Sequence, residues 1–209
     1  MRSPYPRRAF AAGSRYRRRM PLPEPDPPLR DGDVALRPWR PDDAAAVVAA
    51  IDGDEAIGSW LELIPQPYDE ADARAYLERV AAGWADGSLA GFAIVDAATD
   101  EVLGSLGIQI EEPEQGTAET GYWVARAARG RGVASRALGL ASRWALRELG
   151  LERIQLRAAV GNEPSRRVAE KAGFRYEGVL RSVRFNPRLG RRVDWVVYSL
   201  IRADLAGEE

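Results

Sequence analysis

The chain has 209 residues, of which 45% are hydrophobic, and it carries a formal net charge of −1. This length and composition suit a single α/β domain with a full-sized core. Cysteine and histidine are both absent, which excludes a thiolate nucleophile, a Ser-His pair, an imidazole base and a Cys/His zinc site. No metal is expected. A proton acceptor must be a carboxylate, a hydroxyl group, the lone lysine Lys171 or water.

The charge is unevenly distributed along the chain. Residues 1–20 contain seven arginines and no acid, so the other 189 residues carry a net charge of −8. An acidic body argues against nucleic-acid binding, for which a basic face is the usual signature. No apolar run approaches the roughly 20 residues that span a bilayer, and no secretory leader is evident. We expect a soluble cytoplasmic protein without a membrane partner.

Residues 1–31 are rich in Arg and Pro and lack periodicity, which predicts a disordered or extended arm. Met20 is an alternative translation start, in which case residues 1–19 have little role of their own. A transit peptide or an RNA-binding arm is the less favoured alternative. The folded domain is expected over residues 32–205.

Regular patterns begin with a short strand over 34–39. Pro41-Asp42-Asp43 should cap a helix that ends near Ala50, because Asp supplies an acceptor for the first amides of a helix. A second helix is predicted over 69–82. Alternating apolar residues predict a hairpin around 99–101 and another strand over 117–125.

A longer helix is predicted over 131–149 and should end at Gly150. One face of this helix is polar and the other apolar. The polar face holds Ser135, Arg136, Ser142, Arg143 and Arg147, and the apolar face holds Leu138, Ala141, Ala145 and Leu149. A strand over 152–160, a short helix over 163–172 and two strands over 174–184 and 191–201 complete the predicted domain.

The stretch ARAARGRGVASRALG, residues 125–139, joins a strand directly to the longer helix. Gly130 and Gly132 let the backbone approach a ligand closely, and a helix N-terminus directs amide groups toward an anion, usually phosphate. Arg126, Arg129 and Arg131 would add positive charge. A tight connection without a ligand is the alternative.

The spacing of this loop excludes two common phosphate sites. A nucleoside triphosphate loop requires Gly-Lys-Ser/Thr, and no lysine lies here. A dinucleotide fingerprint requires a third glycine at the position of Ser135. A phosphate ligand at this loop would therefore belong to another class.

The pattern Arg129-x-x-Gly132-x-Ala134 resembles the pyrophosphate signature of the GNAT N-acetyltransferase superfamily, Arg/Gln-x-x-Gly-x-Gly/Ala. GYWVARAARGRGVASRAL and LGLERIQLRAAVGNEPSRRVAEKAGFRYEGVLR are similar to the RimJ/RimL-type branch, the ribosomal-protein-alanine N-acetyltransferases. The resemblance covers about residues 32–203. It implies an α/β (α+β) GNAT fold, with a mixed central sheet of about seven strands, a splayed strand pair and about four flanking helices.

The resemblance also implies acetyl-CoA as co-substrate. Its pantetheine arm would lie between the strands over 117–125 and 153–160, and the amine would attack the thioester directly, without cysteine or histidine. Asn162 would bind the pantetheine and also cap the next helix. The donor site is expected to contain Trp123, Val124, Arg129, Gly130, Arg131, Gly132, Val133, Ala134, Ser135 and Asn162.

Two residues are assigned to catalysis. Glu119 alternates onto the strand face of Gly121 and Trp123, where its carboxylate would accept the amine proton directly or through water. The alternative is a glutamate that pairs with a cross-strand arginine. Ser165 would, by resemblance, stabilise or protonate the leaving thiolate. The superfamily often has a tyrosine acid four residues later, and Ala169 at that position shifts this role to Ser165.

Trp60, Glu62, Tyr68 and Asp194 are assigned to the acceptor site, with ordinary packing or solvation as the alternative. A base-poor site favours an α-amine, with a pKa of about 7.7–8.0, over lysine at about 10.4. The expected acceptor is thus a protein or peptide N-terminus. Small-molecule amines, including antibiotics, another donor such as succinyl-CoA, and a non-catalytic acyl-CoA-binding protein are the alternatives. A monomer and a homodimer are both open.

Overall fold

The computed structural model describes residues 20–61, 64–187 and 189–207. Within them, one eight-stranded sheet has the strand order β1-β2-β3-β4-β5-β6-β8-β7. Neighbouring strands are antiparallel except β5 and β6, which are parallel. The strands are β1 (Arg30–Asp31), β2 (Val34–Pro38), β3 (Leu89–Asp96), β4 (Val102–Glu112), β5 (Thr117–Val124), β6 (Arg153–Ala159), β7 (Arg175–Asn186) and β8 (Arg191–Ile201).

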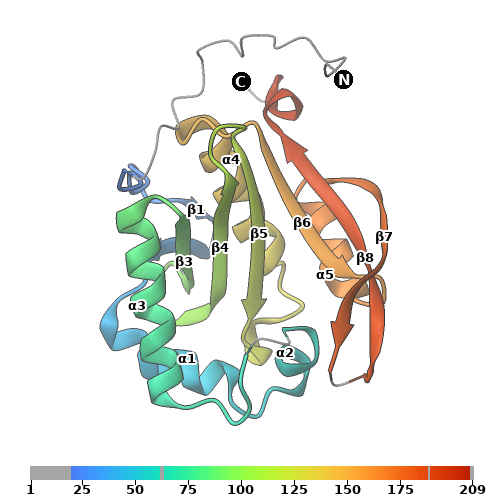
Figure 1. Ribbon diagram of the computed structural model, residues 1–209. Helices are drawn as coiled ribbons and strands as arrows, with labels where there is room; N and C mark the ends of the chain where they lie inside the picture. Colours follow the sequence, from blue (N-terminus) through green and yellow to red (C-terminus); the bar gives the residue numbers. More distant parts are fainter. Residues whose placement is uncertain (1–19, 62–63, 188, 208–209) are drawn as a thin grey trace.

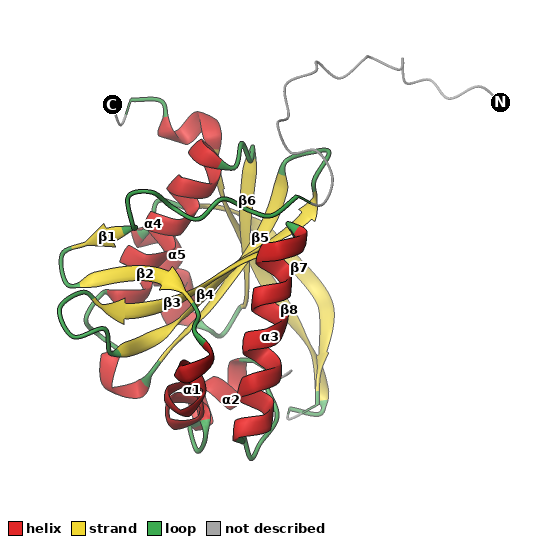
Figure 2. Ribbon diagram, turned by 90° about the vertical axis from the view of Figure 1, so that its left-hand side faces the viewer, coloured by secondary structure: helices red, strands yellow, loops and turns green. Residues whose placement is uncertain are grey.

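The helices lie on both faces of the sheet (Figures 1 and 2). α1 and α3 cover one face over β3 to β5, which we call the front face, and α4 and α5 cover the opposite face. The α-helices are α1 (Ala44–Ile51), α2 (Glu55–Trp60), α3 (Glu70–Asp86), α4 (Val133–Glu148) and α5 (Glu163–Lys171). Short 3-10 turns span Pro41–Asp43, Arg126–Ala128 and Arg202–Leu205. None of the described helices is long and apolar enough to cross a membrane.

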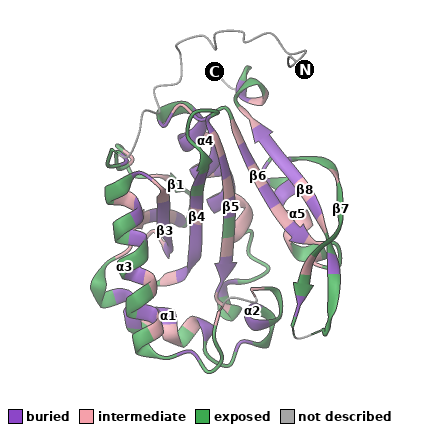
Figure 3. Ribbon diagram, viewed as in Figure 1, coloured by how far each residue is buried: buried purple, intermediate pink, exposed green. Residues whose placement is uncertain are grey.

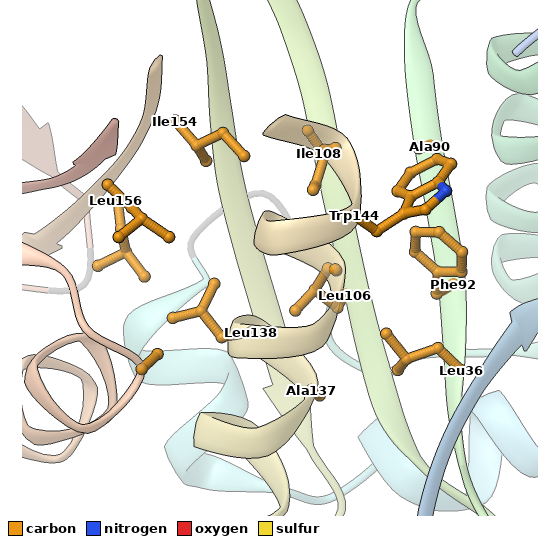
Figure 4. Close-up of a cluster of buried hydrophobic side chains, with 14 of the residues drawn as sticks. Leu36, Ala90, Phe92, Leu106, Ile108, Ala137, Leu138, Trp144, Ile154 and Leu156 are labelled. Carbon is orange, nitrogen blue, oxygen red and sulfur yellow. The ribbon is translucent and has the colours of Figure 1, made fainter. Parts of the chain in front are cut away.

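The main core lies between the sheet and α4 (Figure 4). Trp144 of α4 meets Phe92 of β3 edge to face, with ring centroids 5.5 Å apart, and Leu138 and Leu106 are fully buried beside them. A second cluster lies on the front face between the sheet, α1 and α3. Figure 3 shows the buried centre of the sheet and the largely exposed edge strand β7. Each large apolar side chain buried in this way contributes about 1.5–3 kcal/mol.

The packed part of the chain begins ten residues before the expected domain boundary at residue 32. Leu22 is only 8% exposed, and its N–H donates to the Trp84 carbonyl at 2.9 Å. β1 then pairs with β2, and Arg136 of α4 donates to the Asp31 carbonyl at 3.2 Å. Residues 22–31 therefore belong to the folded body, and residues 1–19 of the expected arm lie outside the described residues.

Three details differ from the sequence prediction. Asp43 does not cap α1 with its side chain, because its carboxylate accepts from the Arg40 amide and the Arg37 guanidinium. Ser142, expected on the polar face of α4, is completely buried. The six-residue helix α2 was not predicted, since a single short turn carries little periodicity.

Candidate active site

β5 and β6 separate along their length, as expected of a splayed pair. Their pairing runs from Thr117 opposite Arg153 to Thr120 opposite Leu156 and then stops. Beyond that point each strand keeps only its other neighbour, so that β5 pairs with β4 and β6 pairs with β8. We call the space between residues 121–124 and residues 157–159 the opening; Figure 1 shows the strands diverging there. Backbone groups on its edges have no strand partner across it, and those not engaged by a side chain can bind a ligand.

Tyr122 and Val124 direct their backbone groups toward the opening, whereas Trp123 does not. The Ala125 N–H donates to the Leu103 carbonyl of β4 at 2.9 Å, and alternation along a strand then turns the Trp123 backbone toward β4 as well. The Trp123 carbonyl lies against Gly104 of β4, and its indole is buried in the second cluster. Of the two strand residues assigned to the donor site, only Val124 faces the opening with its backbone.

We call residues 130–135, the end of the loop before α4 and the first residues of α4, the anion cradle. Gly130 and Gly132 have φ of +77° and +74°, a region that favours glycine. A Cβ on Gly130 would meet no atom within 4 Å, and one on Gly132 would meet only side-chain atoms at 3.9 Å, so both glycines face open space. The first bond of α4 runs from the Arg136 N–H to the Gly132 carbonyl at 3.1 Å.

The cradle presents unpaired amide groups at the positive end of a helix. The N–H groups of Val133, Ala134 and Ser135 precede that first bond and have no acceptor within the helix. The Ser135 hydroxyl donates to the Gly132 carbonyl at 3.0 Å and holds the turn. Amides and helix dipole together make this a site suited to phosphate.

The arginines of the loop do not simply add charge to the cradle. Arg129 turns inward: its Nε donates to the Val124 carbonyl at 3.0 Å and a terminal nitrogen donates to Asp54 at 2.5 Å. Arg131 lies 3.5 Å from Asp33. Arg126 is exposed, and no described residue accepts a hydrogen bond from it. Two of the three arginines are therefore engaged with carboxylates, and the backbone amides are the donors within the cradle itself.

Asp54 is the residue that receives Arg129, and it also caps α2. Its Oδ1 accepts from the amides of Ala56 at 3.0 Å and Ile57 at 3.1 Å. Burial opposes its ionisation, but the hydrogen bonds from Ile57 and Arg129 outweigh burial and hold the pKa of Asp54 below its usual range. The carboxylate is therefore charged at neutral pH.

A cavity of about 730 Å³ adjoins the cradle on the outer side of α4. It begins at Ser135 and Arg136 and extends to Lys171, with residues 26–31 as its other wall. Its lining also includes Arg143 and Arg147. The lining carries five basic side chains and three acidic ones, Asp26, Asp31 and Glu148.

Ser165 lies across the opening from β5 and is held by two contacts. Its backbone N–H donates to Asn162 Oδ1 at 3.2 Å, so Asn162 is the N-cap of α5. Its hydroxyl oxygen accepts from the Tyr122 hydroxyl at 3.0 Å. Burial raises the pKa of Tyr122 to about 12. The sequence pattern did not reveal this contact, because the two residues belong to different elements.

Glu119 lies on the front face and forms an ion pair with Arg157 of β6. This is the cross-strand pairing considered as the alternative to a catalytic base. Arg157 also lies 3.3 Å from Glu111 and 5.6 Å from the ring centroid of Trp195. The Glu119 carboxylate is therefore held by a guanidinium on the front face.

The four acceptor candidates have different surroundings. Trp60, at the end of α2, is 43% exposed. Its ring lies beside Gly161 in the loop after β6, 3.9 Å from the position that a Cβ atom would take there. Tyr68 is only 6% exposed and packs in the second cluster. Asp194 accepts the Ser182 N–H at 2.7 Å within the β7–β8 hairpin. Glu62 lies outside the described residues. Trp60 and Asp194 are both exposed near the end of β6, since the Val160 N–H donates to the Asp194 carbonyl at 3.0 Å, whereas Tyr68 is buried.

No group of three or more Asp and Glu residues that could hold a metal ion occurs in the described parts of the chain. The candidate site brings together backbone amides, two hydroxyl groups, ion-paired carboxylates and an exposed indole.

Comparison with known proteins gives the family of the chain. A family model described as "Acetyltransferase (GNAT) domain" matches residues 33–175. The Bacillus licheniformis protein named "Uncharacterized N-acetyltransferase p20" is 28% identical over 179 residues, which is 86% of this chain and 92% of that protein. The Escherichia coli ribosomal-protein-serine acetyltransferase is 34% identical over 86 residues, 41% of this chain and 48% of that protein.

Solved structures agree with this relationship. Mycobacterium smegmatis RimJ in complex with CoA-disulfide has a TM-score of 0.71 at 26% identity, over 87% of this chain and 92% of RimJ. RimL, a ribosomal L7/L12 alpha-N-protein acetyltransferase in complex with coenzyme A, shares the fold, with a TM-score of 0.76 at 19% identity over 83% of this chain and 97% of RimL. Since the family match spans most of the chain and the splayed strands and the anion cradle are both present, this protein belongs to the GNAT family of N-acetyltransferases, with relatives of the RimJ/RimL type.

Proposed function

We propose that this enzyme transfers an acetyl group from acetyl-CoA to the α-amine of a protein or peptide N-terminus. The observation that carries the proposal is the open front face of β6, β8 and β7, over which no described helix lies (Figure 1). Small-molecule sites are usually concave and enclose most of their ligand. A face of this kind suits the end of an extended chain better than an enclosed small amine.

The donor is assigned to the α4 face of the opening. The backbone of Tyr122, the N–H of Val124 and the amide of Asn162 would bind the pantetheine arm. The cradle, residues 130–135, would bind the pyrophosphate through its amide groups, and the cavity beside Lys171 has room for the nucleotide end. A side chain added at Gly130 or Gly132 would project into this space, which supports the fit.

The acceptor amine would approach from the front face, near Trp60 and Glu119. The amine nitrogen forms a bond to the thioester carbonyl carbon, the C–S bond breaks, and its electron pair passes to sulfur. Glu119, directly or through water, takes the proton that the amine loses. Arg157 retains Glu111 as a partner at 3.3 Å when Glu119 becomes neutral.

Ser165 is assigned to the sulfur end of the reaction. Its hydroxyl would donate a hydrogen bond to the departing thiolate, where negative charge develops. Glu119 on the front face and Ser165 on the α4 face would thus act on the two sides of the opening. The transfer is direct, in keeping with a chain that has no cysteine or histidine nucleophile.

A panel of acceptors tests the proposal. Purified full-length protein is incubated with acetyl-CoA and one amine at a time, and release of free CoA thiol is followed. The panel contains peptides with free N-termini, the same peptides N-terminally blocked but carrying lysine, and small amines including aminoglycosides. We expect the free N-termini to give the highest kcat/KM. A higher kcat/KM for lysine or for a small amine would refute the acceptor assignment. Thiol release only when succinyl-CoA replaces acetyl-CoA would refute the donor assignment. Binding of CoA without thiol release in the presence of any amine would indicate a non-catalytic protein.

A further inference from the structure

The opening between β5 and β6 is bridged on its α4 face by two hydroxyl groups. The Tyr122 hydroxyl donates to Ser165 Oγ at 3.0 Å. Tyr122 belongs to β5 and packs beside the main core, whereas Ser165 belongs to the first turn of α5. The pair therefore joins the two sides of the space in which the thioester is expected.

The direction of this hydrogen bond determines what the Ser165 hydroxyl can do. A serine hydroxyl has one proton to donate and two lone pairs that accept. Since one lone pair is taken by Tyr122, the hydroxyl rotates its own proton elsewhere, and no described residue accepts that proton. The backbone of Ser165 is fixed in addition by Asn162. Ser165 is thus held as a donor whose acceptor is supplied by the ligand.

Tyr122 keeps the proton that it donates to Ser165. Burial raises its pKa to about 12, with the hydrogen bond to Ser165 acting in the opposite sense. The phenol therefore stays protonated throughout the neutral range and remains a donor. A hydroxyl that accepts one hydrogen bond becomes a better donor in the next, because the bonds polarise each other.

We propose that Tyr122 is a positioning residue for acetyl transfer, which holds the Ser165 hydroxyl so that its proton points at the thioester sulfur. As the amine nitrogen bonds to the carbonyl carbon, the electron pair of the C–S bond moves to sulfur, and Ser165 stabilises it by a hydrogen bond. The proton lost by the amine goes to Glu119 or water, and the released thiolate takes a proton from water. The inference rests on the proposed role of Ser165.

A second tyrosine–serine pair supplies a matched control. The hydroxyls of Tyr76 and Ser105 are 2.6 Å apart, in the cluster between α3 and β4 and away from the opening. Tyr76→Phe removes the same chemical group from a buried pair as Tyr122→Phe. Loss of a hydroxyl with a purely structural role should lower Tm and leave kcat unchanged. A fall in kcat in Tyr122→Phe but not in Tyr76→Phe would therefore come from positioning and not from lower stability.

The test measures kcat, acceptor KM, CoA affinity and Tm for Tyr122→Phe, Ser165→Ala, the double variant and Tyr76→Phe. We expect Tyr122→Phe to lower kcat about threefold to tenfold, the effect of one hydrogen bond, while CoA affinity is retained. The double variant should be no slower than Ser165→Ala, because Tyr122 acts through Ser165. Tyr76→Phe should keep the wild-type kcat.

If Tyr122→Phe has the same kcat as the wild-type enzyme, the inference about Tyr122 is wrong and the role of Ser165 is unaffected. The same holds if Tyr122→Phe lowers kcat by the same factor in the Ser165→Ala background as in the wild-type background. If Ser165→Ala keeps the kcat of the wild-type enzyme, both the role of Ser165 and this inference are wrong. The proposed transfer itself would still stand, because the wild-type enzyme would still acetylate the acceptor. If Tyr122→Phe does not fold, Tyr122→3-fluorotyrosine is measured instead. That variant keeps the hydroxyl and strengthens its donation, so it should retain at least the wild-type kcat, and a tenfold loss would contradict the proposal.

Discussion

Arg129 and Asp54 form an ion pair at 2.5 Å that joins the loop before α4 to the N-cap of α2. Arg129 also donates to the Val124 carbonyl at the end of β5, and Asp54 accepts the Ile57 amide. The pair therefore connects the donor side of the opening to the helix that ends in Trp60. Because Asp54 is only 8% exposed, its carboxylate depends on these partners.

Replacing Arg129 should destabilise the fold. Arg129→Leu leaves a buried carboxylate without its cationic partner, and hydrogen bonds to charged groups contribute about 1.5–3 kcal/mol, so the free energy of unfolding should fall by that order. Arg74→Leu is the control, since its ion pair with Glu70 is exposed and such pairs contribute about 0.3–0.5 kcal/mol. Urea unfolding measures both. Equal losses in the two variants would contradict a special role for the Arg129 pair.

The same pair gives a prediction for acid pH. The pKa of Asp54 is lowered in the folded protein, so its contribution is complete above its unfolded pKa of about 3.9 and is lost as pH falls through the lower folded value. The difference in unfolding free energy between wild type and Asp54→Asn should therefore be constant near neutrality and shrink below about pH 4. A difference in unfolding free energy that grows toward acid pH would contradict this prediction.

Gly132 should be required for CoA binding. Gly132→Asn places a side chain in the cradle while keeping φ of +74° accessible, because Asn tolerates this region better than most residues. We expect the Kd for CoA, measured by calorimetry, to rise at least about tenfold, equivalent to 1.4 kcal/mol. Gly190→Asn is the matched control, since Gly190 has φ of +62° and open surroundings in the β7–β8 turn. Unchanged affinity in Gly132→Asn would remove the cradle from the donor site.

Glu119→Gln should change the pH dependence of turnover. If Glu119 accepts the amine proton, kcat/KM should fall about 100-fold or more at low pH, where the acceptor is charged. It should recover partly as pH rises past the α-amine pKa of about 7.7–8.0. Glu111→Gln is the control, because it removes the other carboxylate near Arg157 and leaves Glu119 paired. A wild-type profile in Glu119→Gln would assign the base to water or another carboxylate.

Deletions at the N-terminus should separate the arm from the packed segment. Removal of residues 1–19 should leave turnover of a small acceptor unchanged, since these residues include none of the proposed site residues. Removal of residues 1–31 should lower Tm, because it takes away buried Leu22, strand β1 and the Asp31 carbonyl that Arg136 contacts. A large loss of activity in the shorter deletion would show that the arm contributes to the site.

The strand, glycine loop and helix from Thr117 to Glu148 were predictable because their signals are local: alternation, two glycines and a helical period. The Gly130 and Gly132 conformations follow from the same residues. Contacts between distant segments were not predictable. The pairing of Arg129 with Asp54 depends on how α2 docks, and no spacing in the sequence encodes that docking.

Burial was the other feature that the sequence left open. Tyr68 and Trp123 both carry large aromatic groups that suit either a pocket wall or a core, and α1 and α3 enclose them in the second cluster. Tyr122, by contrast, reaches the opening because it lies on the opposite face of β5, beside α5. Which aromatic residue meets the ligand therefore depends on which face each helix covers.

The most direct test of transfer to an N-terminal α-amine is an intramolecular competition. A peptide with one free α-amine and one lysine is incubated with acetyl-CoA and the full-length enzyme, and tandem mass spectrometry locates the acetyl group, with Gly132→Asn as the inactive control. We predict acetylation at the N-terminal nitrogen, with the lysine unmodified and one CoA thiol released for each peptide. Acetylation of the lysine, or CoA release without a modified peptide, would contradict transfer to an N-terminal α-amine.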